Sequence, residues 1–228
     1  MKKLVVLSGA GISAESGIKT FRDNNGLWEN HDVMDVASIQ GWHNNPELVL
    51  EFYNVRRKNA CKAEANNAHI RIAELEENYD VHIVTQNVDN LHEKAGSTNI
   101  THLHGELTKA KDIYNPDCII DIGSKDIKLG DLSPDGNQLR PFIVWFGEDV
   151  PKMTEAIEIV SDADIILVIG TSMNVYPAAG LINYAPNGCE LFLIDPNPIH
   201  IPHLKVKQYL NTATEGIEQF IKDITKLY

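Results

Sequence analysis

Polar side chains follow an apolar segment near the middle of the chain, in an order that suits ligand binding. Residues 81–85 are rich in Val and Ile, as in a strand buried on both faces of a sheet. Gln86, Asn87, Asp89 and Asn90 come directly after it. Because ligands of open α/β sheets sit beyond the carboxyl ends of the strands, these side chains indicate a binding site. Asp89 or Asn90 could instead cap a following helix. A cap accounts for one of the four polar residues, but not for all four.

Two histidines, His102 and His104, alternate within residues 101–105. On a strand, alternate residues share one face, so the two imidazoles could bind a metal ion together. No third ligand is obvious nearby in the sequence. A single histidine at the end of a strand is instead suited to be a general base, because its pKa lies near neutral pH. In that case the other histidine is structural.

A glycine-rich segment follows the first apolar run, residues 4–7. Gly9, Gly11 and Ala14 stand in the pattern G-x-G-x-x-A, in which glycines let backbone N–H groups approach a pyrophosphate at a helix N-terminus. A tight strand-to-helix turn also uses glycine for packing, and the motif alone does not exclude this. A dehydrogenase needs a second strand and then an acidic residue about 20 positions further on, but residues 20–26 form a polar loop. The motif therefore favours a dinucleotide and disfavours hydride transfer.

Two further strand ends carry candidate binding residues. Gly170, Thr171 and Ser172 follow the apolar residues 165–169. They offer amides and hydroxyls to a phosphate or ribose, although a capped turn explains them equally well. Residues 142–148 run from an apolar strand into an aromatic, glycine-containing edge. Such an edge can accept an extended peptide by strand addition, whereas apolar strands of this kind are more often core.

These residues need a sheet to bring them together, and the rest of the sequence predicts one. Short Val-, Ile- and Leu-rich runs alternate with helical patterns, which is typical of a doubly wound parallel sheet. The expected strands are residues 4–7, 81–85, 142–145, 165–169 and 191–194, and the expected helices are residues 46–62, 65–78 and 154–162. Residues 19–79 and 107–140 interrupt the alternation. We therefore expect one catalytic domain over residues 1–228, with a Rossmann-like lobe of about residues 1–30, 80–106 and 141–228 and a small inserted lobe of about residues 31–79 and 107–140.

The composition limits the partners and the compartment. The 228 residues are 43% hydrophobic, enough for an ordinary core. With 20 basic and 32 acidic residues the net charge is −12, which argues against general binding to nucleic acid or to an anionic membrane. Three widely spaced cysteines, Cys61, Cys118 and Cys189, exclude a disulfide framework and indicate a reducing compartment. Because the apolar run at residues 4–7 is too short for a signal peptide, we expect a cytoplasmic protein, and we expect a monomer.

Taken together, these motifs closely resemble the sirtuins, a family of NAD-dependent protein lysine deacylases. The matching segments occur in the family's order and span nearly the whole chain. They are residues 9–18 (GAGISAESGI), 20–22 (TFR), 85–92 (TQNVDNLH), 104–105 (HG), 144–148 (VWFGE) and 170–172 (GTS). The resemblance implies that NAD and an acyl-lysine bind in the cleft between the two lobes.

The resemblance also implies a reaction and a role for each matching residue. The acyl oxygen of the modified lysine would attack the ribose carbon that releases nicotinamide, and water would finally free lysine and O-acyl-ADP-ribose. His104 would be the general base, with Asn87 and Asp89 as the other catalytic residues. The residues expected to bind NAD are Gly9, Ala10, Gly11, Ile12, Ser13, Phe21, Arg22, Gln86, Asn87, Val88, Asp89, Gly170, Thr171, Ser172, Asp195 and Ala213. The residues expected to line the peptide groove are Val144, Phe146, Gly147 and Glu148.

Three further residues resemble the branch of the family that removes succinyl and malonyl groups. Tyr53 and Arg56 are three apart and share one face of the expected helix. From spacing alone, a surface arginine beside a half-buried tyrosine explains them better. In that branch an alanine, here Ala37, makes the acyl pocket roomy, while a tyrosine and an arginine bind the distal carboxylate. Because a fork of N–H donors and a phenol suit a carboxylate, we expect acidic acyl groups to be preferred and acetyl-lysine to be a secondary substrate.

The sequence departs from the family where the zinc-binding cysteines are expected. Sirtuins usually carry two Cys-x-x-Cys pairs that bind structural zinc. Asp112 and Asn115 stand approximately where the first pair belongs, and Leu132 and Asp135 stand near the second. Cys118 is alone in this region, so we expect no zinc site of the family type. The resemblance still implies NAD as the co-substrate.

Two other functions stay open on the sequence. The same ribose carbon, attacked by water or by another nucleophile, would make the protein an NAD glycohydrolase or an ADP-ribosyltransferase. A chain without turnover would be a non-catalytic NAD-binding module. His104 argues against the module, because a sensor needs no general base.

Overall fold

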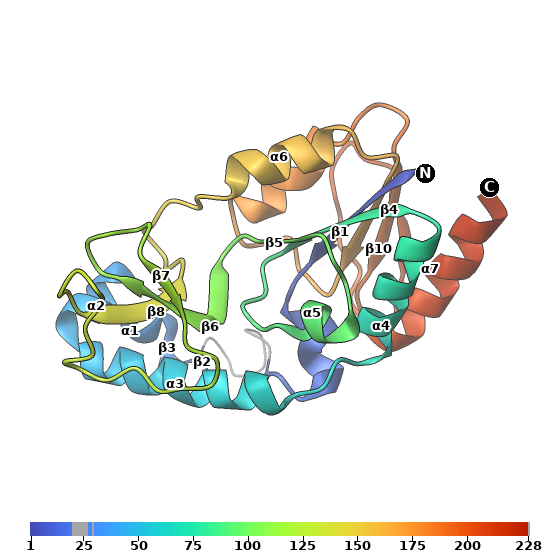
Figure 1. The fold of residues 1–228 in the computed structure, drawn as a ribbon. Coiled ribbons are helices and arrows are strands. Elements are labelled where there is room, and N and C mark those ends of the chain that lie inside the picture. The colour runs from blue at the N-terminus through green and yellow to red at the C-terminus, as the bar shows by residue number, and fades with distance from the viewer. Residues whose placement is uncertain (20–26, 29, 228) are drawn as a thin grey trace.

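The computed structural model describes residues 1–19, 27–28 and 30–227, and it arranges them around two sheets (Figure 1). Within these residues, six parallel strands form the main sheet, in the order β11-β10-β9-β1-β4-β5. They are β1 (Lys3–Ser8), β4 (Asp80–Thr85), β5 (Ile100–His102), β9 (Ile165–Ile169), β10 (Glu190–Ile194) and β11 (Lys207–Tyr209). The predicted doubly wound parallel sheet is confirmed, and its strand order reverses between β1 and β9.

Helices cover both faces of the main sheet, which explains why its central strands are apolar throughout. In β1, Leu4 and Val6 pack with α4 and α7 on one face. Val5 and Leu7 pack with α6 and η3 on the other face. The covering elements are α4 (Asn67–Glu74), the 3₁₀ helix η2 (Leu75–Glu77), α5 (Leu91–Ala95), α6 (Met153–Ser161), the 3₁₀ helix η3 (Ala178–Tyr184) and α7 (Ala213–Leu227). In the part of the chain that the structure describes, no helix has both the length and the apolar character that crossing a membrane requires.

A small antiparallel sheet, in the order β7-β6-β8, lies with three helices beside the main sheet (Figure 1). Its strands are β6 (Gly105–Asp112), β7 (Ile119–Asp121) and β8 (Leu139–Ile143), and the helices are α1 (Val33–Val36), α2 (Ile39–Asn44) and α3 (Pro46–Lys62). The short strands β2 (Leu27–Trp28) and β3 (His31–Asp32) pair with each other. Helix α3 has its predicted bounds because Asn45 caps it, accepting from the Leu48 backbone N–H at 3.1 Å, and Pro46 occupies its first turn.

Arg57 connects α3 to the small sheet and its loops. Its side chain is fully buried. The guanidinium donates from Nε to the Leu107 carbonyl, and from Nη1 to Asn54 Oδ1 and the Lys125 carbonyl. A buried guanidinium with several acceptors is costly to disturb, because removing it would leave those acceptors unpaired. Of the two adjacent arginines on α3, Arg57 is therefore the structural one.

Two predicted elements differ from the structure. The sequence predicts a strand of the parallel sheet at residues 142–145, and this is wrong, because β8 ends at Ile143 and pairs antiparallel with β6. An apolar run indicates that a strand is buried but does not indicate its partner or its direction. Residues 65–78 were expected in the small lobe, but α4 and η2 pack their Ala68, Ile72 and Leu75 into the core of the main sheet.

Asp112, at the end of β6, is the centre of a hydrogen-bonded cluster in the loops before β8. Its carboxylate is buried, and one oxygen accepts from the backbone N–H groups of Tyr114 (2.7 Å) and Asn115 (3.0 Å). The other oxygen accepts from Ser133 Oγ and from Asn137 Nδ2 (3.1 Å). Burial alone would raise the pKa of Asp112, but these donors lower it to about 2. This donor set does not match a four-thiolate zinc site, and the hydrogen bonds to Asp112 hold these loops to β6.

We expect Asp112→Ala to lower the melting temperature by roughly 5 °C or more, because four donors lose their acceptor at once. The carboxylate stabilises the fold fully above its ordinary pKa near 4, and this contribution is lost as pH falls towards the folded pKa of about 2. The difference between wild type and variant should therefore shrink in acid. Thermal unfolding between about pH 3 and pH 7 measures this, with the exposed Asp117→Ala as the matched control. Equal melting temperatures at neutral pH, or a wild-type melting temperature that falls on adding a chelator, would contradict it.

Candidate active site

A cavity of about 560 Å³ opens at the carboxyl ends of the main-sheet strands. It includes the ends of β1 and β9, where the strand order reverses and where open α/β sheets usually bind their ligands. The predicted residues that line it are Gly9, Ala10, Gly11, Ala37, Tyr53, Arg56, Gln86, Asn87, Val88, Asp89, His104, Val144, Phe146, Gly147, Glu148, Gly170, Thr171, Ser172, Asp195 and Ala213. Phe21 and Arg22 lie outside the described residues.

The glycine motif is explained partly by packing and partly by the cavity. Gly11 donates its N–H to the Gly170 carbonyl at 2.8 Å, and a Cβ on Gly11 would lie 2.7 Å from the Gly170 Cα. Gly170 has φ +64°, and a Cβ there would meet the Ile12 nitrogen at 2.2 Å. The packing alternative is therefore correct for Gly11, and it also holds for Gly9, where a Cβ would lie 2.7 Å from the Thr171 Cβ. Gly9 and Ala10 also line the cavity, but the Gly9 N–H already donates to the Ile169 carbonyl at 3.1 Å, so the partly exposed Ala10 is the residue of the turn that a ligand can reach.

A 3₁₀ helix, η1 (Ala10–Ser16), begins directly after Gly9 and includes Gly11. Ile12 packs in the core of the main sheet. Ser13 is buried, and its Oγ donates to Asp89 Oδ2 at 3.1 Å and accepts from Asn87 Nδ2 at 3.2 Å. Of these two predicted NAD-binding residues, Ile12 serves the core and Ser13 orients two other site residues.

Asp89 binds the first turn of α5 and lines the cavity. Its Oδ1 accepts from the backbone N–H of Leu91, the first residue of α5, at 3.1 Å, while the N-cap residue Asn90 makes no side-chain capping hydrogen bond. Burial raises its pKa, and the hydrogen bonds from Leu91 and Ser13 oppose that rise. The structure thus places a buried, oriented carboxyl group in the cavity wall.

A buried chain of hydrogen bonds, which the sequence does not predict, holds the backbone N–H of Asn87. The Asn87 N–H donates to Thr85 Oγ1 at 3.0 Å. Ser8 Oγ donates to the same oxygen at 2.8 Å, and Ser8 Oγ lies 3.0 Å from His92 Nε2. Ser8 and Thr85 are the last residues of the adjacent strands β1 and β4, so only their pairing reveals the contact.

His104 and His102 face different partners and do not form the metal pair that was considered from their spacing. Strand β5 ends at His102, so the alternation does not continue to His104. His104 Nδ1 lies 3.2 Å from the Gln86 carbonyl, which can only accept, so Nδ1 carries the hydrogen and Nε2 is left with a lone pair. Burial lowers the pKa of His104, which keeps the imidazole neutral at pH 7. This is the form that a general base requires.

Polar groups from β9 and β10 line another part of the cavity. Thr171 Oγ1 accepts from Gln86 Nε2 at 3.2 Å, which links the ends of β4 and β9. Asp195 is buried, and its Oδ1 accepts from the Asn197 backbone N–H at 2.9 Å. Ser172 and Ala213 line the cavity beside them. This region offers a hydroxyl and a carboxylate to a sugar.

The α3 side of the cavity carries a positive charge next to a phenol. Tyr53 is fully buried, and its hydroxyl oxygen lies 3.2 Å from Trp145 Nε1, which donates to it. Burial is the main cause that raises the pKa of Tyr53 to about 12, so the phenol keeps its proton and can donate. The Arg56 guanidinium lies 4.0 Å from the ring centre of Trp28. Trp28 is not among the site residues predicted from the sequence. Ala37 lines the same cavity and is buried.

Glu148 lines the cavity, but its carboxylate serves the fold. Arg140 donates to both of its oxygens, at 2.9 and 2.8 Å, and the Trp145 N–H donates to one of them at 2.8 Å. Burial would raise the pKa of Glu148, but Arg140 and Trp145 lower it. Phe146, which is 44% exposed, donates its backbone N–H to the Ala37 carbonyl at 2.9 Å. Glu148 therefore fixes the turn that carries Phe146 and Gly147.

A glycine turn, a buried carboxyl and a neutral histidine at the carboxyl edge of a doubly wound sheet define a nucleotide-binding α/β protein. Comparison with known proteins gives its family. Residues 9–177 match the family model described as Sir2 family. The chain therefore belongs to the Sir2 family.

Individual relatives agree with this assignment over most of the chain. An NAD-dependent protein deacylase of Bacteroides thetaiotaomicron is 52% identical over 225 residues, covering 96% of each protein. An NAD-dependent protein deacylase of Helicobacter pylori is 54% identical over 204 residues, covering 89% of each. A solved complex of a Sir2 homologue with NAD has a TM-score of 0.86 and 36% identity, covering 99% of this chain and 90% of that one.

Proposed function

We propose that this chain, an NAD-dependent protein deacylase of the Sir2 family, prefers lysines that carry succinyl or malonyl groups. The observation that carries the preference is the proximity of the Arg56 guanidinium and the protonated Tyr53 phenol in one cavity wall. Both are hydrogen-bond donors, and an acidic acyl group ends in a carboxylate that can accept from both. An acetyl group has no atom that would use them.

The stacking of Arg56 supports the same preference. Its carbon Cζ lies 4.0 Å from the Trp28 ring centre and 5.5 Å from that of Phe52. Aromatic contacts of this kind hold the plane of the guanidinium, so less conformational freedom is lost when a carboxylate binds. Ala37, with its small side chain, leaves room in the same cavity for the longer acyl chain.

The residues of the cavity fit NAD as the co-substrate. The Gly9–Ala10 turn lies in the cavity wall, where the partly exposed Ala10 can contact a phosphate, and the buried Asp89 carboxyl can accept from an amide. The residues proposed to hold NAD are Gly9 and Ala10 at the phosphates, Gln86, Asn87 and Asp89 at the nicotinamide riboside, and Thr171, Ser172, Asp195 and Ala213 at the adenosine, with Phe21 and Arg22 from the sequence alone. NAD, when bound, supplies a ribose carbon whose bond to nicotinamide can break.

His104 is proposed as the general base. Its Nδ1–H is fixed on the Gln86 carbonyl, so Nε2 can accept the proton of a ribose hydroxyl. Val144, Phe146 and Gly147 are proposed to bind the extended peptide, with Glu148 holding their turn.

Product analysis tests the proposal. The protein is incubated with NAD and a succinyl-, malonyl-, acetyl- or unmodified peptide, and nicotinamide and O-acyl-ADP-ribose are quantified by chromatography. We expect nicotinamide release to require an acylated peptide, with kcat/KM at least about tenfold higher for the acidic groups than for acetyl. Release without acylated peptide would instead support a glycohydrolase or ADP-ribosyltransferase. Binding of NAD without turnover would support a non-catalytic module.

A further inference from the structure

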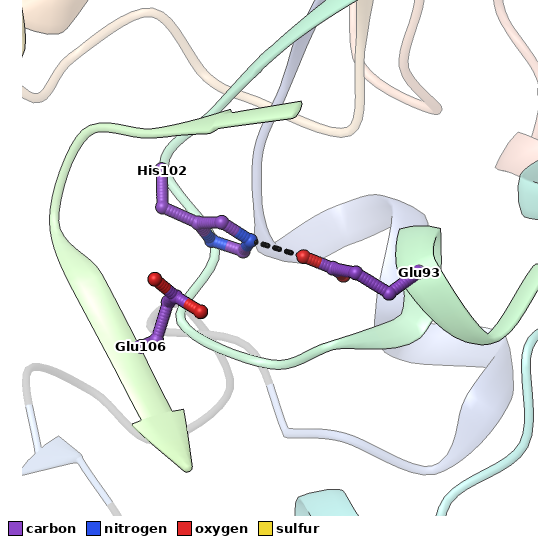
Figure 2. Close-up of side chains that lie close together, drawn as sticks. All are labelled: Glu93, His102 and Glu106. Carbon is purple, nitrogen blue, oxygen red and sulfur yellow. Dashed lines mark hydrogen bonds and ion pairs between the residues drawn. The ribbon is translucent and has the colours of Figure 1, made fainter. Parts of the chain in front are cut away.

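His102 lies between two groups that can only accept hydrogen bonds. Its Nδ1 is 2.9 Å from the Asn87 backbone carbonyl, and its Nε2 is 2.7 Å from Glu93 Oε1 (Figure 2). A neutral imidazole has one N–H, so it can satisfy one of the two. The geometry therefore requires both ring nitrogens to carry hydrogen, which makes His102 an imidazolium.

The charges around His102 agree with this protonation state. Glu93 comes from α5 and Glu106 from β6, and Figure 2 shows the ring between these two carboxylates. Burial would lower the pKa of His102, but Glu93, the Asn87 carbonyl and Glu106 raise it above its ordinary value. The other titratable neighbours are Asp89, whose charge also attracts the imidazolium, His92, which is buried and neutral, and Lys109, which pairs with Glu106 at 2.8 Å.

Asn87, whose carbonyl contacts His102, makes three hydrogen bonds to the protein. The N–H of Asn87 donates to Thr85 Oγ1, and its side-chain amide donates to Ser13 Oγ. His102 holds the carbonyl, and with it the peptide plane that leads to Val88 and Asp89. The other two contacts each join groups that do not titrate, so His102 is the one of these three partners of Asn87 that itself gains or loses a proton.

We propose that His102, held by Glu93, is a positioning residue that fixes the peptide between Asn87 and Val88 for the nicotinamide end of NAD. This rests on the proposed role of Asn87 and Asp89 in binding that end. The neutral ring keeps one N–H, and the Glu93 carboxylate, as the stronger acceptor, takes it. The contact to the Asn87 carbonyl is therefore complete below the ordinary histidine pKa of about 6.5 and disappears as pH rises through the raised pKa of the folded protein. NAD binding therefore weakens on the alkaline side, while ADP-ribose, which lacks nicotinamide, is held equally well across the same range.

Three variants distinguish the effect of the His102 hydrogen bond from the effect of its protonation. His102→Ala removes the contact, and we expect KM for NAD to rise about tenfold with a smaller change in kcat. His102→Asn keeps an N–H donor near the Asn87 carbonyl without a titrating group, so KM should recover and its alkaline rise should disappear. Glu93→Gln removes the charge and offers an amide N–H that can donate to Nε2 of the neutral ring, so Nδ1–H can stay on the Asn87 carbonyl. The alkaline rise of KM should therefore disappear in this variant, while KM in mild acid is unchanged.

The matched controls come from a similar pair on the opposite edge of the sheet. His82 Nε2 lies 3.1 Å from Asp80 Oδ1 at the start of β4, away from the cavity. His82→Asn and Asp80→Asn should leave the pH profile unchanged. The measurements are KM and kcat between about pH 6 and pH 9, and the dissociation constants of NAD and ADP-ribose for the same proteins.

The outcomes distinguish this inference from the proposed function. If wild type binds no NAD or releases no nicotinamide, the proposed function fails, whatever the variants do. If wild type turns over but Glu93→Gln superimposes on it at every pH, the positioning role is wrong. Equal weakening of NAD and ADP-ribose by His102→Ala would also overturn it, because a general structural defect would explain both. Activity lost to a chelator and restored by Zn²⁺ or Mn²⁺ only when Glu93, His102 and Glu106 are intact would mean that these groups hold a cation instead.

Discussion

Replacing His104 with alanine is expected to lower kcat for deacylation by about 10²- to 10⁴-fold, the usual contribution of a general base. The Nδ1–H of His104 is held by the Gln86 carbonyl at 3.2 Å, so the wild-type imidazole presents a lone pair on Nε2. Alanine leaves no group there that can accept a proton. The dissociation constant of NAD should change by no more than about twofold, since the substitution removes one hydrogen bond to a backbone carbonyl.

The measurement is a single-turnover rate with succinyl-peptide, together with NAD binding by calorimetry. His43→Ala, at an exposed position on α2, is the control for removal of an imidazole. If His104→Ala kept more than about a tenth of the wild-type rate, His104 would not be the base. A large loss of NAD binding would mean that the histidine shapes the site instead.

The pKa values of the two histidines around Leu103 are shifted in opposite directions. We therefore expect two separate pH-dependent changes in the kinetics. Burial lowers the pKa of His104, so its basic form persists below neutral pH and kcat falls only in acid. The pKa of His102 is raised, so its charged form persists above the ordinary value and disappears in base. Titration of His104 should change kcat in acid, and titration of His102 should change KM for NAD in base. A profile in which both parameters share one limb would contradict this division.

Residues at strand ends could be predicted from the sequence because parallel strands bring their carboxyl ends to one edge. Asn87, His104 and Thr171 come shortly after three different strands, and the topology alone places them around one cavity. Helix α3 was predicted with its observed bounds because its start is encoded locally, by Asn45 and Pro46. In these cases the information lies within a few residues of the feature.

Features that depend on pairing across the chain could not be predicted. The hydrogen bond from Ser8 to Thr85 joins residues 77 apart, and it exists only because β1 and β4 are neighbours in register. Arg56 and Arg57 are chemically the same in the sequence, yet one lines the cavity and the other is fully buried against Leu107. The direction of β8 likewise depends on its partner β6, which an apolar pattern does not identify.

Arg56→Met is expected to lower kcat/KM for succinyl-peptide by about 100-fold and to change kcat/KM for acetyl-peptide by less than about threefold. Methionine keeps the apolar length of the side chain, so packing against Trp28 and Phe52 is largely preserved while the charge is removed. The carboxylate of the substrate then enters a buried wall with the Tyr53 phenol as its remaining donor, and a charge buried without its partner is costly. An acetyl group brings no charge and loses little.

Tyr53→Phe should have the same direction with a smaller effect, roughly tenfold, because a neutral donor contributes less than a guanidinium. Lys58→Met is the matched control: it removes a cation from the same helix, where Lys58 pairs with Asp126 outside the cavity. The selectivity is measured as the ratio of kcat/KM for succinyl- and acetyl-peptide at one NAD concentration, so that any effect on NAD binding cancels. Equal losses on both peptides would show that Arg56 supports the fold of α3 and not the choice of acyl group. A ratio that falls for Arg56→Met and Tyr53→Phe but not for Lys58→Met would assign the preference to the two donors, because only these two line the cavity.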